Sequence, residues 1–432
     1  MHTLKFITCG SVDDGKSTLI GRLLLDSKAI LADQLASASR TGIKVGAGDA
    51  PDLAAFTDGL QAEREQGITI DVAWRYFSTP ARKFIIGDTP GHEQYTRNMV
   101  TAASHADAAI VMVDATKINW QNTACTLLAQ TKRHSLLVEL LRVPNLIFAV
   151  NKLDAVASPA QAFTSIQRSI QTFCSAAGVT PQAVLPLSAL AGHNVVLREP
   201  GWADYQGPSL LETLEALVLP AQTTDTDTKD IPHFSVQWVE RPESSLSGDR
   251  GRRIYWGQLL AGRLRVGDQL QAQPSGQTAC IADLLDTVRS GLETTPATAN
   301  RSYGVILDRE IDLSRGDWLT SGRGEPASKC ITATVAWLDS RPLRTGDTYW
   351  ALHGHRWTKA KVAAIEHQID IQTLATIPTD QLDMNAIGSV HLQLQTPLPV
   401  RPYAVHRSLG SLILVDPSTH ATAGAVMAQT VS

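Results

Sequence analysis

The sequence has few cysteines, no long hydrophobic run and no excess of positive charge, and each absence excludes a class of protein. Its five cysteines are an odd number without a C-x-x-C pair, which favours reduced thiols over a disulfide framework or a zinc site. No run approaches the roughly 20 apolar residues that span a bilayer, and no basic region precedes a secretory core at the N-terminus. The net charge of −4 argues against a strongly basic nucleic-acid surface. We therefore expect a cytoplasmic protein that binds neither membranes nor nucleic acid.

A phosphate-binding pattern lies near the N-terminus. Residues 10–17 read Gly-Ser-Val-Asp-Asp-Gly-Lys-Ser, which is G-x-x-x-x-G-K-S. The apolar run 4–9 precedes it and a helical pattern follows it, which is the strand, loop and helix context that the pattern needs. We expect the loop N–H groups to hold phosphate, Lys16 to reach the β- and γ-phosphates, and the Ser17 hydroxyl to bind Mg²⁺. The alternative is a chance glycine turn with a surface lysine.

A second polar segment, Asp-Thr-Pro-Gly-His at 88–92, follows another short apolar strand. Asp88 would hold Mg²⁺ through a water, and the Gly91 N–H would sense the γ-phosphate. His92 could orient the attacking water, or it could simply cap the next helix. Upstream, Thr69 in Gly-Ile-Thr could contact both Mg²⁺ and the γ-phosphate, although a threonine also suits an ordinary strand.

The segment Asn-Lys-Leu-Asp at 151–154 ends a later strand. The Asp154 carboxylate can accept two parallel hydrogen bonds, which guanine offers from N1–H and its 2-amino group and adenine does not. Asn151 would tie this segment to the phosphate loop, and Ser-Ala-Leu at 188–190 would add a backbone N–H to the guanine oxygen.

These motifs together predict a GTPase that uses GTP, GDP and Mg²⁺. The predicted catalytic residues are Lys16, Thr69, Gly91 and His92. The predicted metal ligands are Ser17, Thr69 and Asp88. The predicted nucleotide contacts are Gly10, Ser11, Val12, Asp13, Asp14, Gly15, Lys16, Ser17, Thr18, Asp88, Thr89, Pro90, Gly91, His92, Asn151, Lys152, Leu153, Asp154, Ser188, Ala189 and Leu190.

Short strands alternate with helices over the first half of the chain, which implies a mostly parallel sheet with helices on both faces. The predicted strands are 4–9, 68–75, 83–87, 108–113, 145–150 and 183–187, and the predicted helices are 17–30, 92–104, 121–141, 159–177 and 209–217. In strand 68–75 the alternation places Ile68, Ile70, Val72 and Trp74 on one face. Beyond a polar segment, turn-rich short strands indicate two small β-barrels. The predicted domains are an α/β P-loop GTPase domain at 1–220, a linker at 221–230, and β-barrel domains at 231–324 and 325–432.

The segments 58–72 and 88–99 resemble the large subunit of bacterial sulfate adenylyltransferase, the GTPase half of ATP sulfurylase. That family descends from the translation elongation factors, which typically have G-H-V-D-H-G-K in the phosphate loop. This chain has Gly-Ser-Val-Asp-Asp-Gly-Lys, as the sulfurylase subunit does. The resemblance covers nearly the whole chain, including 186–190, 207–212, 310–317 and 341–349.

The resemblance implies a heterodimer with a smaller catalytic subunit. That partner transfers AMP from ATP to sulfate, which gives adenosine 5′-phosphosulfate and pyrophosphate, and GTP hydrolysis is coupled to this uphill reaction. Some relatives carry a fused adenylylsulfate kinase domain. The sequence shows no second phosphate-loop motif before it ends at Ser432, so we expect this chain to lack that activity.

One departure and two other functions stay open. The stretch 118–125 is extra relative to the family pattern, and it could form a partner surface or an inert loop. The chain could instead be an elongation-factor-like GTPase that binds aminoacyl-tRNA, or a degenerate GTPase that serves as a scaffold. The phosphate-loop variant and the acidic net charge speak against the first, and the intact Lys16, Thr69, Asp88 and His92 speak against the second.

Overall fold

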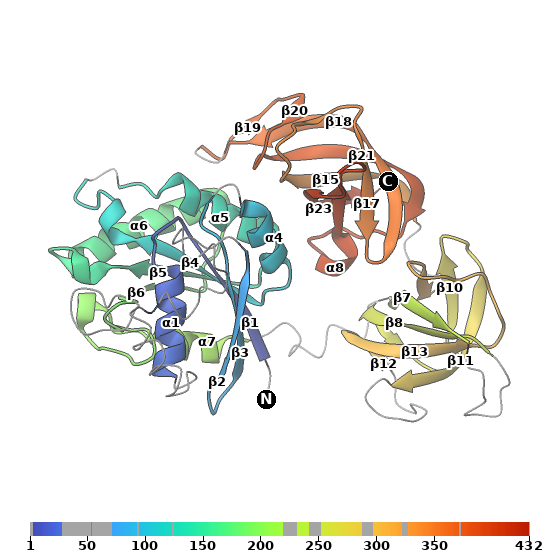
Figure 1. Ribbon diagram of the computed structural model, residues 1–432, viewed down its shortest axis with the longest axis horizontal. Helices are drawn as coiled ribbons and strands as arrows, with labels where there is room; N and C mark the ends of the chain where they lie inside the picture. Colours follow the sequence, from blue (N-terminus) through green and yellow to red (C-terminus); the bar gives the residue numbers. More distant parts are fainter. Residues whose placement is uncertain are drawn as a thin grey trace. The chain divides into compact units, whose positions relative to one another are not determined.

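The computed structural model describes residues 3–27, 53, 71–92, 95–122, 125–218, 231–241, 252–286, 297–321, 327–370 and 373–431 (Figure 1). The chain divides into two compact units, Met1–Gln222 with Asp370–Ala375, and Thr223–Ile369 with Thr376–Ser432. Thr69 and the predicted linker 221–230 lie outside the described residues, and the limits of the three predicted domains and of the linker stay predictions. All five cysteines are free thiols.

A six-stranded sheet with the order β2-β3-β1-β4-β5-β6 forms the centre of the first unit. Its strands are β1 (Thr3–Cys9), β2 (Ala73–Ser78), β3 (Lys83–Asp88), β4 (Ala108–Asp114), β5 (Asn145–Asn151) and β6 (Ala183–Pro186). The pairings from β3 through β6 are parallel, and only the edge strand β2 is antiparallel. Every residue of β4 and β5 is buried, as expected for central strands covered on both faces.

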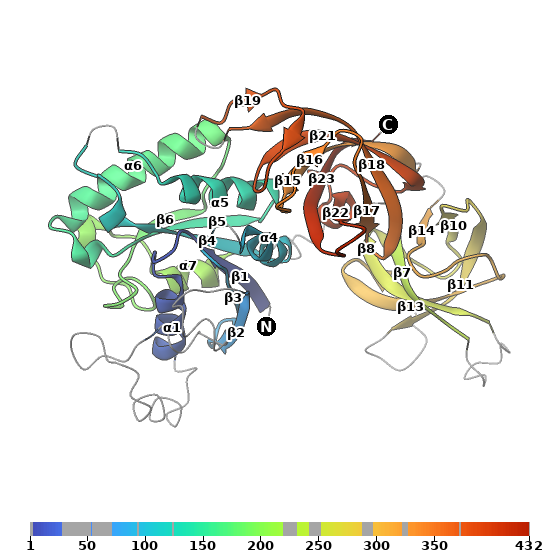
Figure 2. The ribbon, with the colours of Figure 1, turned by 45° about the horizontal axis from the view of Figure 1, so that its top comes forward.

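Helices cover both faces of this sheet. They are α1 (Lys16–Asp26), α4 (Thr96–Ser104), α5 (Ala129–Leu140), α6 (Pro159–Ala177) and α7 (Leu210–Ala216). Apolar residues of α1 and α7 share one core cluster with β1, β3 and β4, and Figure 2 shows α5 and α6 on the opposite face. The predicted α/β fold is therefore confirmed. No helix of the described residues combines the length and the apolar character that a membrane crossing requires.

Three predicted elements begin later than the sequence suggests. Helix α4 begins at Thr96 rather than at 92, and α5 begins at Ala129 rather than at 121. Ahead of α5, the Trp120 N–H bonds the Ile118 carbonyl at 2.9 Å, and the Ser169 hydroxyl on α6 donates to the Cys125 carbonyl at 2.9 Å. The turn at 118–120 and the bond from Ser169 to the Cys125 carbonyl replace the i to i+4 hydrogen bonds that a helix beginning at 121 would need.

The third element is β2, and of the predicted alternating residues the structure describes only Val72, which is half-buried, and Trp74. Residues 68–70 lie outside the described residues, the strand begins at Ala73, and Phe77 is buried while Trp74 is 38% exposed. An edge strand is half open to solvent, so a tryptophan there does not have to point into the core.

The second unit begins with a closed six-stranded barrel. It consists of β7 (His233–Glu240), β8 (Ile254–Ala261), β10 (Gln269–Gln273), β11 (Thr278–Asp286), β13 (Arg301–Leu307) and β14 (Trp318–Ser321), and the short pair β9 (Arg263–Leu264) and β12 (Ala297–Thr298) lies beside it. Residues of β8 alternate strictly between buried and half-buried, because one face of each strand fills the barrel interior.

The other strands of this unit form a second barrel. They are β15 (Ser328–Trp337), β17 (Thr348–His353), β18 (Arg356–Ile369), β21 (Ile387–Leu398), β22 (Ser411–Val415) and β23 (Thr422–Val431), with β19 (Thr376–Ile377) added to β18. Pairing of β17 with β18 closes the ring. A two-stranded pair, β16 (Leu343–Arg344) with β20 (Gln381–Leu382), and the short helix α8 (Arg407–Gly410) complete it. Both predicted barrels are present.

Polar and aromatic contacts join the two barrels within this unit. Arg356 pairs with Asp317, and the His353 ring stacks on Trp318 with centroids 5.0 Å apart. His353 is fully buried and donates from Nδ1 to the Ser411 carbonyl; burial lowers its pKa to about 4.

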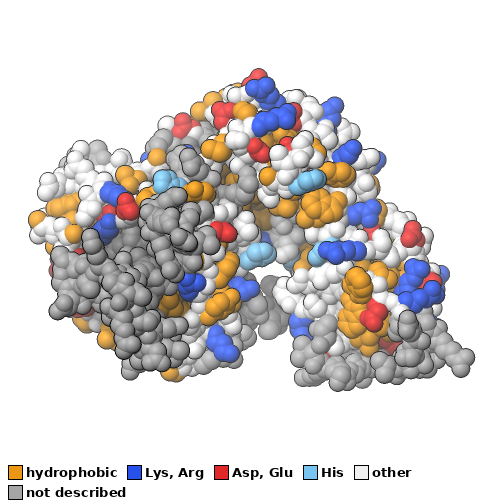
Figure 3. Space-filling view, in the orientation of Figure 1, with side chains coloured by type: hydrophobic (Ala, Val, Ile, Leu, Met, Phe, Trp, Pro, Cys, Tyr) orange, Lys and Arg blue, Asp and Glu red, His pale blue; other side chains and the backbone are white. Residues whose placement is uncertain are grey.

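On the face shown in Figure 3, acidic and basic side chains of the described residues are interspersed and do not form a patch of one charge.

Candidate functional site

The phosphate loop, residues 10–17, joins the carboxyl end of β1 to the first turn of α1. Three of its residues have positive φ: Gly10 at 148°, Asp13 at 61° and Gly15 at 90°. A side chain at Gly15 would place its Cβ 2.4 Å from the Asn151 amide nitrogen, so glycine is required there by both conformation and space. The first N–H groups of α1 have no intrahelical acceptor, and the curled loop therefore ends at a helix N-terminus suited to an anion.

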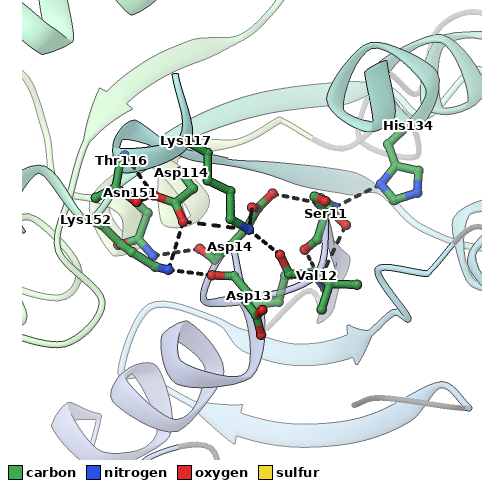
Figure 4. Close-up of polar contacts among 12 residues, drawn as sticks. Ser11, Val12, Asp13, Asp14, Asp114, Thr116, Lys117, His134, Asn151 and Lys152 are labelled. Atoms are coloured by element: carbon green, nitrogen blue, oxygen red, sulfur yellow. Dashed lines mark hydrogen bonds and ion pairs between the residues drawn. The ribbon is translucent and has the colours of Figure 1, made fainter. Parts of the chain in front are cut away.

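Side chains from the loop itself and from other elements donate hydrogen bonds to the carbonyls of this loop (Figure 4). Lys16 Nζ donates to the carbonyls of residues 10 and 11 at 3.3 and 2.7 Å. The next three carbonyls, of residues 12, 13 and 14, accept from Lys117, from Lys152 at 2.6 Å and from Asn151 at 2.8 Å. Five successive carbonyls thus have partners, and this pattern stabilises the curled backbone.

Lys16 is only 6% exposed. Burial lowers the pKa of its ammonium group, and the carboxylates of Asp88 and Asp14 raise it again in part. A phosphate bound here would neutralise the buried ammonium group and accept hydrogen bonds from the N–H groups at the helix N-terminus.

Two of the three predicted metal ligands lie together. Ser17 Oγ donates to Asp88 Oδ2 at 2.8 Å, and Thr8 Oγ1 donates to the other carboxylate oxygen at 3.0 Å. Asp88 is 1% exposed. A carboxylate and a hydroxyl are the oxygen donors that Mg²⁺ takes in proteins, so these residues fit such an ion. The third predicted ligand, Thr69, lies outside the described residues.

The segment 88–91 packs directly on the phosphate loop. A Cβ at Gly91 would lie 2.6 Å from Lys16 Nζ and 2.8 Å from backbone atoms of Ser11 and Val12. Thr89 Oγ1 donates to the Thr8 carbonyl at 2.6 Å, and both Thr89 and Pro90 are buried. Because Gly91 has no side chain, the two segments can touch through their backbones.

His92 is exposed and its ring lies 6.4 Å from that of Tyr95, edge to face. It is not the cap residue of α4, because that helix begins at Thr96 with Tyr95 in the cap position. The Tyr95 N–H bonds the His92 carbonyl at 3.1 Å, and both alternatives for His92 stay predictions.

Asn151 connects the predicted segments 151–154 and 188–190 to the phosphate loop. It is 2% exposed, its amide donates to the Asp14 carbonyl, and its Oδ1 accepts the Ala189 N–H at 2.9 Å. Leu153 and Ser188 are buried, whereas Asp154 and Leu190 are exposed. The structure thus brings together four of the predicted segments, 10–17, 88–91, 151–154 and 188–190, at the carboxyl edge of the sheet.

A charged cluster at the loop joins the predicted residues Asp14 and Lys152 to Asp114 and Lys117, which were not predicted as site residues. The Asp14 side chain is fully buried, accepts the Ser11 N–H at 2.6 Å and pairs with Lys117 at 3.1 Å. Burial raises the pKa of Asp14, and the charges of Lys16 and Lys117 lower it in part. Burial also raises the pKa of Asp114, but hydrogen bonds from Lys152 and Thr116 lower it more, so its net shift is downward. The available signal was an aspartate at the end of β4.

His134 on α5 is the second residue that sequence reasoning missed. Its Nδ1 accepts the Gly10 N–H at 3.0 Å, and Gln130, one turn earlier, lies 2.9 Å from its Nε2. The ring is fully buried, and burial lowers its pKa to about 3. A neutral ring leaves the Nδ1 lone pair available to Gly10. The spacing of Gln130 and His134, four apart on one helix face, was the only signal.

Comparisons with known proteins agree with this site. Residues 1–224 match the elongation factor Tu GTP binding domain, and residues 330–429 match the GTP-eEF1A C-terminal domain-like family. The chain is 43% identical over 424 residues to the bifunctional enzyme CysN/CysC of Xylella fastidiosa, covering 98% of this chain and 65% of that protein. It is 42% identical over 428 residues to sulfate adenylyltransferase subunit 1 of Laribacter hongkongensis and of Citrobacter koseri, covering 98% of this chain and 84% and 85% of those proteins.

Proposed function

The chain belongs to the sulfate adenylyltransferase subunit 1 family, within the translation-factor GTPases, and on that premise we propose that it is the GTPase subunit of an ATP sulfurylase. In this function GTP hydrolysis is coupled to the formation of adenosine 5′-phosphosulfate and pyrophosphate from ATP and sulfate, on a smaller catalytic subunit in the cytoplasm. The single observation that carries the proposal is the phosphate loop tied through Asn151 to the segments 151–154 and 188–190.

The loop backbone and Lys16 hold the phosphates in this proposal. Lys16 already reaches over the loop to its carbonyls, and a bound phosphate offers it a negatively charged partner instead. Ser17 and Asp88, which lie in hydrogen-bond contact, would hold Mg²⁺ together with Thr69. Bound Mg²⁺ supplies positive charge to the β- and γ-phosphate oxygens.

His92 and Gly91 act at the γ-phosphate in this proposal. Gly91 abuts Lys16 and the loop backbone, which supports a contact of its N–H with the terminal phosphate. His92 follows it in an exposed position, free to turn toward a water for in-line attack. Asp154 selects guanine, because its carboxylate accepts both N1–H and the 2-amino group.

Coupling to the partner requires two conformations. The GTP-bound and GDP-bound states must differ in affinity for the catalytic subunit or for its bound intermediates, because a ligand shifts an equilibrium only by its differential affinity. Contacts of Thr69 and Gly91 with the γ-phosphate would distinguish those states, since hydrolysis removes the group that they touch.

The test is to co-purify the chain with its catalytic subunit and to measure pyrophosphate release from ATP and sulfate with and without GTP. We expect release to depend on GTP in the parent complex and not in Lys16→Ala, which removes the phosphate-binding cation. Lys83→Ala is a matched control, because Lys83 is exposed at the opposite end of β3. Equal release in the presence and absence of GTP would refute the coupling.

A further inference from the structure

Lys117 lies at the end of the short 3-10 helix Ala115–Lys117, which follows β4. We propose that Lys117 is a positioning residue for the nucleotide: it keeps the phosphate loop in its binding conformation through Asp14 and the Val12 carbonyl, and so slows the dissociation of guanine nucleotide. The inference rests on the proposed function, since it concerns the same nucleotide site.

The contacts of Lys117 converge on the part of the loop that Lys16 does not reach. Its Nζ donates to the Val12 carbonyl and to Asp14 Oδ1 at 3.1 Å, and lies 3.8 Å from Asp114 Oδ2. Asp14 Oδ2 in turn accepts the Ser11 N–H at 2.6 Å. Lys117 therefore acts on two peptide groups of the loop, on the 12–13 peptide directly and on the 10–11 peptide through the carboxylate, as the contacts drawn in Figure 4 show.

The charge of Asp14 explains why a cation is required there. Its side chain is fully buried, whereas that of Lys117 keeps 34% of its surface exposed. A buried carboxylate without a paired cation is costly and tends to take up a proton. A protonated Asp14 would be a weaker acceptor for the Ser11 N–H, so loss of Lys117 would loosen the loop at two places.

The backbone at Lys117 is held in place by contacts of the neighbouring residues. Asp114 caps the short helix, with its Oδ1 accepting from the Thr116 N–H at 2.9 Å and from the Thr116 hydroxyl at 2.6 Å. Ala115 and Ile118, on either side, are 0% and 5% exposed. A backbone held in this way directs the lysine stem at the loop, which is what a positioning residue needs.

The experiment measures the release of fluorescently labelled GDP, chased with unlabelled GDP in stopped flow, from the full chain and its variants. We expect Lys117→Met to raise the dissociation rate about tenfold, a change of about 1.4 kcal/mol, while the association rate changes less than twofold. Lys117→Arg should recover most of the slow rate, because it restores a cation beside Asp14. Lys83→Met is the control for removal of an exposed lysine and should leave both rates unchanged.

A double-mutant cycle separates this role from a general effect on folding. Asp14→Asn removes the charge that Lys117 neutralises, so in that background Lys117→Met should raise the dissociation rate by less than it does in the parent, because only the contact with the Val12 carbonyl is left to lose. Multiplicative effects of the two changes, or a rate within twofold of the parent for Lys117→Met, would overturn the inference alone. A parent chain that binds no labelled GDP would overturn the proposed function and the inference together. Should Lys117→Met fail to fold, Asp14→Asn and Lys117→Arg test the same pair, and parent-like rates in Asp14→Asn would again overturn it.

Discussion

Replacing Asn151 by aspartate changes one donor into an acceptor at the centre of the site. The amide now donates to the Asp14 carbonyl at 2.8 Å and accepts the Ala189 N–H at 2.9 Å. Asp at this position keeps the acceptor for Ala189 but places a second oxygen against the Asp14 carbonyl. Because residue 151 is 2% exposed, water does not readily separate the two oxygens.

The expected magnitude follows from these two facts. A buried polar group that loses its partner costs about 1–3 kcal/mol, and more when it is charged. We therefore expect Asn151→Asp to cost about 3 kcal/mol in total, divided between folding and nucleotide binding. If most of the cost falls on binding, the affinity for GDP decreases roughly one hundredfold.

Two measurements separate the cost to folding from the cost to nucleotide binding. Urea denaturation without nucleotide gives the free energy of unfolding, and calorimetric titration with GDP gives the dissociation constant. Asn145→Asp is the matched control: it lies at the other end of β5, it is 8% exposed, and its amide donates to the Asp107 carbonyl at 2.9 Å. We expect this control to lose a similar free energy of unfolding and to bind GDP as the parent does.

The reasoning would be refuted by a GDP affinity of Asn151→Asp within threefold of the parent. It would also fail if Asn145→Asp weakened binding as much, because the effect would then reflect any buried asparagine in the strand rather than the tie between the loops.

Other perturbations test separate parts of the site and of the fold. Asp154→Asn should weaken GTP binding at least tenfold and strengthen binding of xanthosine triphosphate, because an amide can donate to the xanthine 2-oxo group; parallel titrations with both nucleotides decide this. Gly91→Ala should lower GTP affinity more than GDP affinity, since the new Cβ would lie 2.6 Å from Lys16 Nζ; equal losses for the two nucleotides would contradict it. His353 has a pKa of about 4 in the folded chain, so between about pH 6.5 and 4 it takes up a proton only when the chain is unfolded. The free energy of unfolding should therefore decrease as pH falls from about 6.5 to 4, and His353→Asn should reduce that slope by about 1.4 kcal/mol per pH unit, measured by urea denaturation at several pH values.

Much of the site could be predicted because its motifs are local. The loop 10–17 contains its own glycines, its lysine and its helix start, and the segments 88–92, 151–154 and 188–190 each follow a short apolar strand. Carboxyl ends of parallel strands meet at one edge of a sheet, so the approach of Asn151 to Asp14 follows from the order of the elements.

The tertiary structure alone decided which distant side chains hold the loop. His134 contacts Gly10 across 124 residues, and Lys117 contacts Asp14 across 103. Neither pairing follows from a residue pattern, because each depends on the start of a helix, at Ala129 and at Ala115, and on the direction in which a buried side chain points. A local motif determines the shape that a backbone can adopt, whereas the groups that hold it there come from wherever packing brings a helix against it.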